Sequence, residues 1–210
     1  ISAKVLLQIK NVLRDFKPDI VLVHGDTTTS SMAALAAFYE KIPVGHVEAG
    51  LRTYNIYSPW PEEMNRQITG RISTYHFAPT ENSKQNLINE GIDPARIYVT
   101  GNTVIDALYL ALNKINSDKY IKEKVFDQIL DAGYNNIVEL ENGKRSLILI
   151  TGHRRENFGE GFINICHAIK EIAQNNLDYD LIYPVHLNPN VQKPVYEILD
   201  GLKNVYLLHP

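Results

Sequence analysis

Three acidic residues occupy positions from which they could take part in proton transfer. Asp26 follows residues 19–23, which predict a buried strand, and Glu48 follows a second such run at residues 43–47. Parallel neighbouring strands end at the same sheet edge, where ligands bind in open α/β sheets. Glu62 comes after a long aromatic loop and just before a helical pattern. Carboxylates in different environments can supply an acid and a base, so this pattern indicates acid–base catalysis.

The same residues also have a structural interpretation. Asp and Thr are favoured helix N-caps, and Asp26 precedes three threonines that begin a helical pattern. The acidic pair Glu62 and Glu63 is favoured at a helix start by the helix dipole. Three acidic positions that converge on one edge exceed what solubility requires, so we keep both hypotheses.

Residues 151–161 form a second candidate site, rich in glycine and in basic side chains. His153, Arg154 and Arg155 lie in this predicted strand-to-helix turn. Such a turn exposes backbone N–H groups and the positive end of a helix, which suits an anion. Alternatively, one arginine pairs with Glu156 or with another carboxylate. The pattern is neither a Walker A loop nor a dinucleotide fingerprint.

The histidines show no metal-binding pattern. His24, His46 and His76 lie near predicted strands without metal-ligand spacing, and His186 follows a strand, a position typical of hydrogen-bonded structural histidines. Cys166 is expected to be a small core residue. We therefore predict no metal site.

Strand-like runs alternate with helical patterns, which indicates an α/β fold with parallel sheets. Strands are expected at residues 19–23, 43–47, 75–78, 97–100, 146–151, 180–185 and 205–208, and helices at residues 5–16, 27–39, 64–72, 81–90, 103–115, 161–174 and 191–199. Residues 116–145 look polar and irregular apart from a helical piece near 120–130. We predict two Rossmann-like domains, 1–102 and 103–210, with a hinge near residues 101–102.

The composition is that of an ordinary globular protein. Of 210 residues, 44% are hydrophobic and 21% charged, and the net charge is −3. Nothing in this balance indicates a nucleic-acid surface, and no apolar run approaches the roughly 18 residues that span a bilayer. We expect no signal peptide, and a single cysteine suits a reducing cytoplasm.

Six motifs appear in an order that identifies a known family. They are His24-Gly-Asp-Thr-Thr-Thr29, His46-Val-Glu-Ala-Gly-Leu-Arg-Thr53, Ser58-Pro-Trp-Pro-Glu-Glu-Met-Asn-Arg66, Thr100-Gly-Asn-Thr-Val-Ile-Asp106, Thr151-Gly-His-Arg-Arg-Glu-Asn157 and Tyr183-Pro-Val-His-Leu-Asn-Pro189. Together they closely resemble the bacterial non-hydrolysing UDP-N-acetylglucosamine 2-epimerases, through essentially the whole chain. The resemblance implies a GT-B-type fold with an active site in an interdomain cleft. It also implies that a family strand and loop before Ile1 and a later segment after Pro210 are missing.

The resemblance further implies an activity and its residues. UDP-N-acetylglucosamine and UDP-N-acetylmannosamine would interconvert by elimination and re-addition of UDP through a 2-acetamidoglucal, without a cofactor, to supply cell-surface polysaccharide. The matching positions are Asp26, Glu48, Glu62 and His153 for catalysis, Arg52, Arg66, Arg154 and Asn157 for substrate binding, and His186 for an activating second UDP-N-acetylglucosamine. A cytoplasmic homodimer without nucleic-acid or membrane partners is expected.

Three alternatives remain open at this point. They are a hydrolysing 2-epimerase, a GT-B glycosyltransferase and a sugar-nucleotide-binding module without catalytic activity. The motif at residues 46–53 and the Pro61-Glu-Glu sequence speak against the hydrolysing enzyme.

Overall fold

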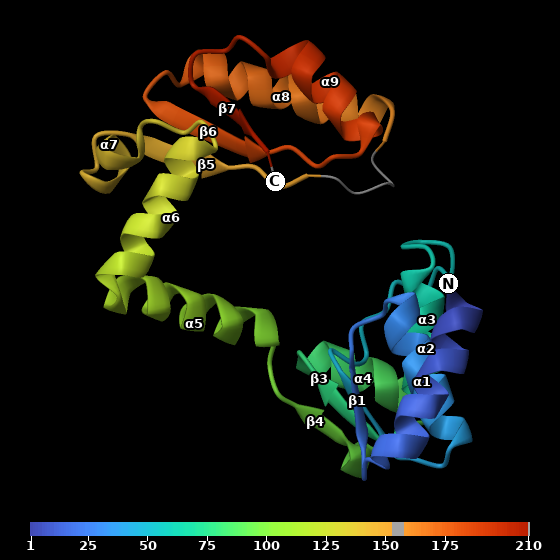
Figure 1. Cartoon of the computed structure of the whole chain (residues 1–210). Coiled ribbons are helices and arrows are strands. Elements are labelled where there is room, and N and C mark those ends of the chain that lie inside the picture. Colours follow the sequence, from blue (N-terminus) through green and yellow to red (C-terminus); the bar gives the residue numbers. More distant parts are fainter. Residues whose placement is uncertain (153–157, 210) are drawn as a thin grey trace. The chain divides into compact units, whose positions relative to one another are not determined.

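The computed structural model describes residues 1–152 and 158–209. The chain divides into two compact units, Ile1–Leu110 and Ala111–Pro210, so the division falls inside helix α5 (Thr103–Ser117). Each unit contains one parallel sheet with helices around it (Figure 1). The predicted α/β class with parallel sheets is therefore confirmed.

The first unit is built on a four-stranded parallel sheet in the order β1-β2-β3-β4. Its strands are β1 (Val21–His24), β2 (Val44–Val47), β3 (Tyr75–Ala78) and β4 (Ile97–Val99). Its helices are α1 (Ser2–Phe16), α2 (Thr28–Tyr39), α3 (Glu62–Ile72) and α4 (Glu81–Asn89), with a 3-10 turn η1 (Pro94–Arg96) before β4. The helix predicted from residue 64 begins at Glu62 instead, which places both acidic residues of the pair in its first turn.

Two buried clusters hold this unit together. Leu13 of α1 and the alanines of α2 pack on Val23 and Val44 of the sheet, and the small alanine side chains let α2 approach closely. Leu87 of α4 packs with Ala49, Ala78 and Ile97 in the second cluster. These contacts fix the strand ends from which the candidate residues project.

Gly50, just after β2, is required by close packing. Its φ is +86°, and a Cβ atom there would lie 2.2 Å from the backbone oxygen of Ser83. Any side chain would push the turn after β2 away from α4, so this position must be glycine.

The second unit contains a three-stranded parallel sheet in the order β5-β6-β7. The strands are β5 (Ser146–Leu149), β6 (Tyr179–Pro184) and β7 (Val205–Leu208), and the helices are α6 (Lys119–Asp131), α7 (Ile137–Glu141), α8 (Glu160–Asn175) and α9 (Pro189–Leu199). Successive residues of a strand point to opposite faces. Leu181 and Tyr183 accordingly belong to the cluster with α8 and α9, whereas Ile182 belongs to the one with Tyr134 and Ile137.

The helical piece predicted near residues 120–130 is confirmed as α6, whereas the short helix α7 was not predicted within this irregular segment. Phe126 and Ile129 of α6 and Ile137 of α7 pack in one cluster on the sheet. The polar composition that suggested irregular structure belongs to the exposed sides of these helices. Cys166 is buried in the core, as expected.

A buried ionic network anchors these helices to β6. The side chain of Asp180 is fully buried and receives hydrogen bonds from the Tyr134 hydroxyl at 3.0 Å and the Asn136 amide at 3.2 Å. Arg145 contacts both of its carboxylate oxygens, at 2.7 and 2.6 Å. Burial, followed by the hydrogen bond to Asp180, raises the pKa of Tyr134 well above its usual value.

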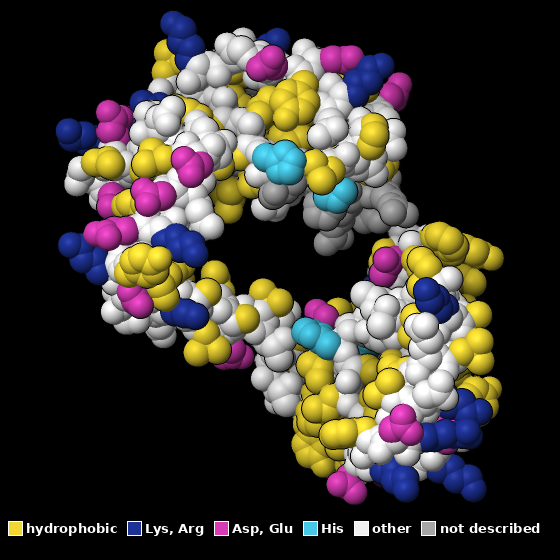
Figure 2. Space-filling model, viewed as in Figure 1, with side chains coloured by type: hydrophobic (Ala, Val, Ile, Leu, Met, Phe, Trp, Pro, Cys, Tyr) yellow, Lys and Arg dark blue, Asp and Glu magenta, His cyan; other side chains and the backbone are white. Residues whose placement is uncertain are grey.

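The surface is mixed in character. Basic and acidic side chains are interspersed on the view in Figure 2. Hydrophobic side chains are also exposed along α5, where Val104, Leu108 and Leu110 are each more than half exposed (Figure 2). Among the described residues, no helix is long and apolar enough to cross a membrane.

Candidate active site

The structure brings the three predicted carboxylates to one region of the first unit. β1 and β2 are paired up to His24 and Val47, so Asp26 and Glu48 follow directly at the same sheet edge. The Oε2 atom of Glu48 lies 3.4 Å from the position of a Cβ atom on Gly25. Glu62, at the start of α3, is close enough to Asp26 for its negative charge to raise the pKa of that carboxyl.

Asp26 is not the helix cap. The cap of α2 is Thr27, whose side-chain oxygen accepts the Ser30 N–H at 3.2 Å. Asp26 Oδ2 instead lies 2.9 Å from Arg66 Nη2. The capping interpretation therefore applies to the threonine and leaves the Asp26 carboxylate available for chemistry.

The pKa of Asp26 is raised above its usual value. Burial is the main cause, and the negative charges of Glu62 and Glu63 add to it, while the Arg66 guanidinium opposes the shift. A carboxylate with a raised pKa is a stronger base and exchanges protons closer to neutral pH. The Asp26 side chain is 26% exposed, so a ligand can still reach it.

The backbone around these carboxylates adopts unusual conformations. Gly25 has φ +70°, and Glu48, which has a side chain, has φ +66°. Left-handed φ values in residues other than glycine are uncommon and gather at functional sites. His24 Nε2 lies 3.6 Å from Glu48 Oε2, so an imidazole stands beside this carboxylate.

Glu63, the second residue of the acidic pair, has a structural role that the sequence pattern did not indicate. Its side chain is fully buried, and it accepts hydrogen bonds from the backbone N–H groups of Thr53 and Tyr54 and from Gln67 Nε2. Burial alone would raise the pKa of Glu63, but these hydrogen bonds and the Arg66 charge outweigh it and lower the pKa. Glu63 thus fixes the start of the aromatic loop that leads to Glu62.

The two arginines predicted to contact substrate have different surroundings. Arg66 is mostly buried and bridges Asp26 and Glu63, at 2.9 and 3.6 Å. The side chain of Arg52 is fully buried and grips Glu90 through Nε and Nη2, at 2.6 and 2.7 Å. Arg52 therefore ties the loop after β2 to the end of α4, and its predicted substrate contact stays a prediction.

Two buried histidines lie behind the carboxylates on neighbouring strands. His46 on β2 and His76 on β3 are register partners, and each is almost completely buried. His46 Nε2 lies 2.9 Å from the carbonyl oxygen of Gly25. Because a carbonyl only accepts, Nε2 carries the proton and His46 is a neutral donor.

Both histidines are held in the neutral form. Burial is the main cause that lowers the pKa of each to about 4. The positive charge of Arg52 lowers both pKa values further. For His46, the charges of His76 and His24 also lower the pKa, and the hydrogen bond to Gly25 raises it without reversing the shift. For His76, the charge of Arg96 also lowers the pKa, and Ser73 and Glu90 raise it without reversing the shift.

These histidines predict a pH-dependent stability. Their folded pKa of about 4 lies below the ordinary 6.5, so the unfolded chain binds protons first as pH falls. Their contribution is complete above about pH 6.5 and is lost towards pH 4, by about 2 kcal/mol for each histidine between pH 7 and 5. Urea unfolding at several pH values measures this loss. His76→Leu should remove about half of it, and an unchanged pH slope would contradict this assignment.

In the sequence, the candidate residues of the second unit follow the runs that form β5 and β6. His153, Arg154 and Asn157 lie outside the described residues. Immediately before them, the Gly152 carbonyl accepts a 2.7 Å hydrogen bond from the hydroxyl of buried Tyr183. Burial raises the pKa of Tyr183 to about 12, so this donor keeps its proton at physiological pH.

His186 follows β6, as predicted, and lies just before α9. Its side chain is exposed, and Nδ1 accepts the Asn188 N–H at 3.1 Å. Asn188 in turn caps α9. The histidine is therefore held by the turn that connects the strand to the helix.

Comparison with known proteins decides the family. The model of the UDP-N-acetylglucosamine 2-epimerase family matches residues 1–210. The chain belongs to this family. It is 59% identical over its whole length to a UDP-N-acetylglucosamine 2-epimerase of Campylobacter jejuni and 52% identical to one of Salmonella typhimurium. It covers 53% and 54% of these proteins, so it spans about half the length of the curated relatives it matches.

Solved epimerases share the fold. The structure of the Neisseria meningitidis UDP-GlcNAc 2-epimerase bound to UDP-GlcNAc matches the whole chain with 50% identity and a TM-score of 0.88, over 54% of its own length. The Methanocaldococcus jannaschii enzyme in complex with UDP-GlcNAc and UDP matches the whole chain with 33% identity and a TM-score of 0.72, also over 54%. These relatives have the GT-B-like fold, which the α/β architecture of this family member follows.

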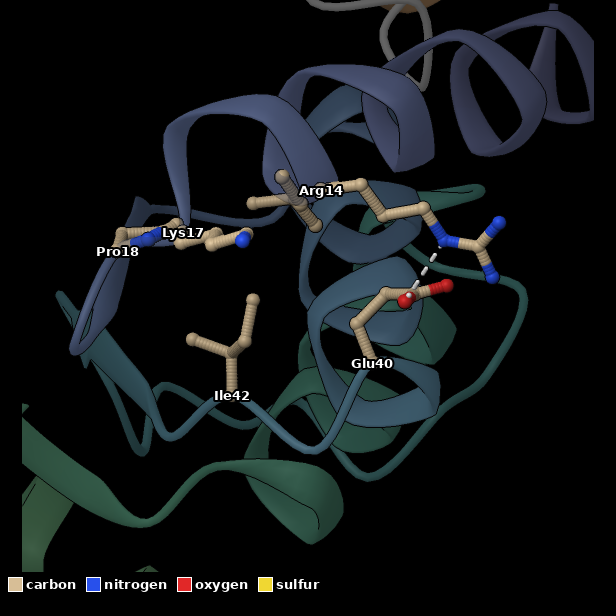
Figure 3. A pocket seen from close by; sticks show the side chains of 6 residues that line it. Arg14, Lys17, Pro18, Glu40 and Ile42 are labelled. Carbon is tan, nitrogen blue, oxygen red and sulfur yellow. Dashed lines mark hydrogen bonds and ion pairs between the residues drawn. The ribbon is translucent and has the colours of Figure 1, made fainter.

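Two pockets of this epimerase-family chain lie away from the carboxylates. The first, of about 320 Å³, is lined by Leu13, Arg14, Lys17, Pro18, Glu40 and Ile42 (Figure 3). The second, of about 530 Å³, includes Ile42 and Pro43. Both lie where the strands begin, opposite the edge that carries Asp26, and Arg14 is already paired with Glu40 at 3.0 Å. Within the described ranges, no cluster of three or more His, Cys, Asp or Glu could hold a metal ion.

Proposed function

We propose that this protein interconverts UDP-N-acetylglucosamine and UDP-N-acetylmannosamine without hydrolysing the sugar nucleotide. The observation that carries the proposal is the cluster of Asp26, Glu48 and Glu62 at one strand edge, with Arg66 2.9 Å from Asp26. Membership in the epimerase family, and relatives crystallised with UDP-GlcNAc, support it.

The chemistry requires a base and good positioning. The proton on C2 is not next to a carbonyl and is therefore only weakly acidic. Its removal is coupled to cleavage of the C1–O bond, so the electron pair of C2–H forms the C1–C2 double bond and UDP leaves. Protonation of the resulting 2-acetamidoglucal at C2 on the opposite face, with re-addition of UDP at C1, completes the epimerisation. No redox step and no cofactor enter the balance.

The residues divide this work according to their environments. Asp26 accepts a proton, because its pKa is raised and its carboxylate is partly exposed. Arg66 positions Asp26, and Glu63 positions the loop that leads to Glu62. Glu48 and Glu62 complete the proton-transfer group. We assign stabilisation of the departing diphosphate to His153, Arg154 and Asn157, on their match to the family motif.

The setting of the reaction is also a proposal. We infer a cytoplasmic homodimer that supplies N-acetylmannosamine units for cell-surface polysaccharide, with UDP-N-acetylglucosamine as substrate. His186 is proposed to contact a second, activating molecule of that sugar nucleotide.

Proton NMR of the products tests this function. The protein, as its cell makes it, is incubated with UDP-N-acetylglucosamine alone. We expect a mixture of the two UDP sugars with no free hexosamine. Free N-acetylmannosamine and UDP in equal amounts would indicate a hydrolysing enzyme. Turnover only with an added acceptor would indicate a glycosyltransferase. Binding without turnover would indicate a sugar-nucleotide-binding module.

A further inference from the structure

The peptide group between Gly25 and Asp26 is held by an unusual set of contacts. The Gly25 N–H donates to the Val47 carbonyl at 3.0 Å, which extends the β1–β2 pairing by one residue. The Gly25 carbonyl accepts from His46 Nε2 at 2.9 Å. One residue earlier, the His24 carbonyl accepts from the Ser30 hydroxyl at 2.7 Å. The backbone that delivers Asp26 is therefore fixed on both sides.

Gly25 needs this restraint. Its φ of +70° lies in the left-handed region, and glycine has no Cβ atom to restrict its backbone angles. Gly25 by itself therefore does little to fix the conformation of the turn. Glu48 Oε2 lies 3.4 Å from where a Cβ atom of Gly25 would stand, so Gly25 lies between the two acidic residues. A rotation of the 25–26 peptide would change the distances from Asp26 to Glu48 and to Arg66.

His46 suits the task of fixing this peptide. The ring is rigid and only 1% exposed, and it belongs to β2, which ends one residue before Glu48. A neutral imidazole donates one hydrogen bond without placing another positive charge beside Asp26, where Arg66 already supplies one. An ammonium or guanidinium in its place would hold the carbonyl but weaken Asp26 as a base.

We propose that His46 is a positioning residue, whose hydrogen bond to the Gly25 carbonyl sets the Asp26 carboxylate in register with Glu48 and Arg66. The proposal rests on the proposed epimerase function for its catalytic consequence. The positioning itself is a property of the first unit and can be tested without turnover.

The chain offers a matched control in His76. It is the register partner of His46, equally buried and neutral, yet its ring makes no hydrogen bond to residues 24–26 in the part of the chain that the structure describes. His46→Leu removes the donor, His46→Gln keeps an amide donor of similar reach, and His76→Leu removes a buried imidazole without touching the turn.

The three variants are compared with wild type for kcat, KM and the pKa of Asp26, by carbon-13 NMR of labelled aspartate in the folded state. A misplacement of about 1 Å can lower a rate about 100-fold, so His46→Leu should lower kcat by about 10- to 100-fold with KM within about 3-fold. His46→Gln should stay within about 5-fold, and His76→Leu within about 3-fold, of wild type. The pKa of Asp26 should move by about 0.5 or more in His46→Leu and stay in place in His76→Leu.

The outcomes separate this inference from the proposed function. Equal losses of kcat in His46→Leu and His76→Leu, or a His46→Gln variant as poor as His46→Leu, would overturn the positioning role. If the wild type proves inactive, the proposed function fails, and the positioning role of His46 is then tested by the pKa of Asp26 alone. An unmoved pKa in His46→Leu then overturns the inference, and a selective shift supports it.

Discussion

Asp26→Asn is expected to lower kcat by about 1,000-fold while KM changes little. The amide cannot accept a proton, and general acid–base catalysis contributes about 10²- to 10⁴-fold to rates. The fold should survive, because Asp26 is partly exposed and is not the cap of α2. Initial rates with UDP-N-acetylglucosamine, followed by proton NMR, measure the effect.

Asp19→Asn is the matched control for this variant. Asp19 is exposed and precedes β1, at the opposite end of the strand from Asp26. Its substitution makes the same change of charge and should leave kcat within about 2-fold, because surface substitutions away from special features have small effects. An Asp26→Asn variant as active as the control would exclude Asp26 from proton transfer.

Asp180→Ala is expected to give the largest loss of stability in the second unit, about 3 kcal/mol in the free energy of unfolding. The Asp180 carboxylate is fully buried, and its removal leaves the Tyr134 hydroxyl and the Asn136 amide without this acceptor. It also removes the partner of Arg145, and breaking a buried ion pair from one side is strongly destabilising.

Urea unfolding at pH 7 measures this loss against Asp178→Ala. Asp178 lies two residues earlier and is exposed, so its substitution should change the free energy of unfolding by no more than about 0.5 kcal/mol. Equal unfolding midpoints for the two variants would show that the network around Asp180 does not stabilise this unit.

Much of the fold could be predicted from the sequence because its elements have clear local signals. Alternating strand and helix patterns gave the α/β class, and the strand-end rule placed Asp26 and Glu48 at one edge. The helical piece at α6 was predicted, but the five-residue helix α7 was missed because it depends on the packing of Ile137 against the sheet, which a polar composition conceals.

The supporting residues were harder to predict for geometric reasons. Glu62 and Glu63 are adjacent, and which of two neighbouring helix residues faces inward depends on where the helix begins. The sequence shows only that Arg52 is positively charged, and such a charge could bind a phosphate as well as a carboxylate. The structure shows that Arg52 is paired with Glu90. His46 acts through a backbone carbonyl that lies 21 residues away in the chain.

The central claim is that the carboxylate cluster exchanges the proton on C2, and deuterium incorporation measures this directly. The protein is incubated with UDP-N-acetylglucosamine in heavy water, and the recovered UDP sugars are examined by NMR and mass spectrometry. We predict deuterium at C2 of both epimers in the wild type and about 1,000-fold slower incorporation in Asp26→Asn. UDP-N-acetylmannosamine formed with its original C2 proton retained would contradict the account.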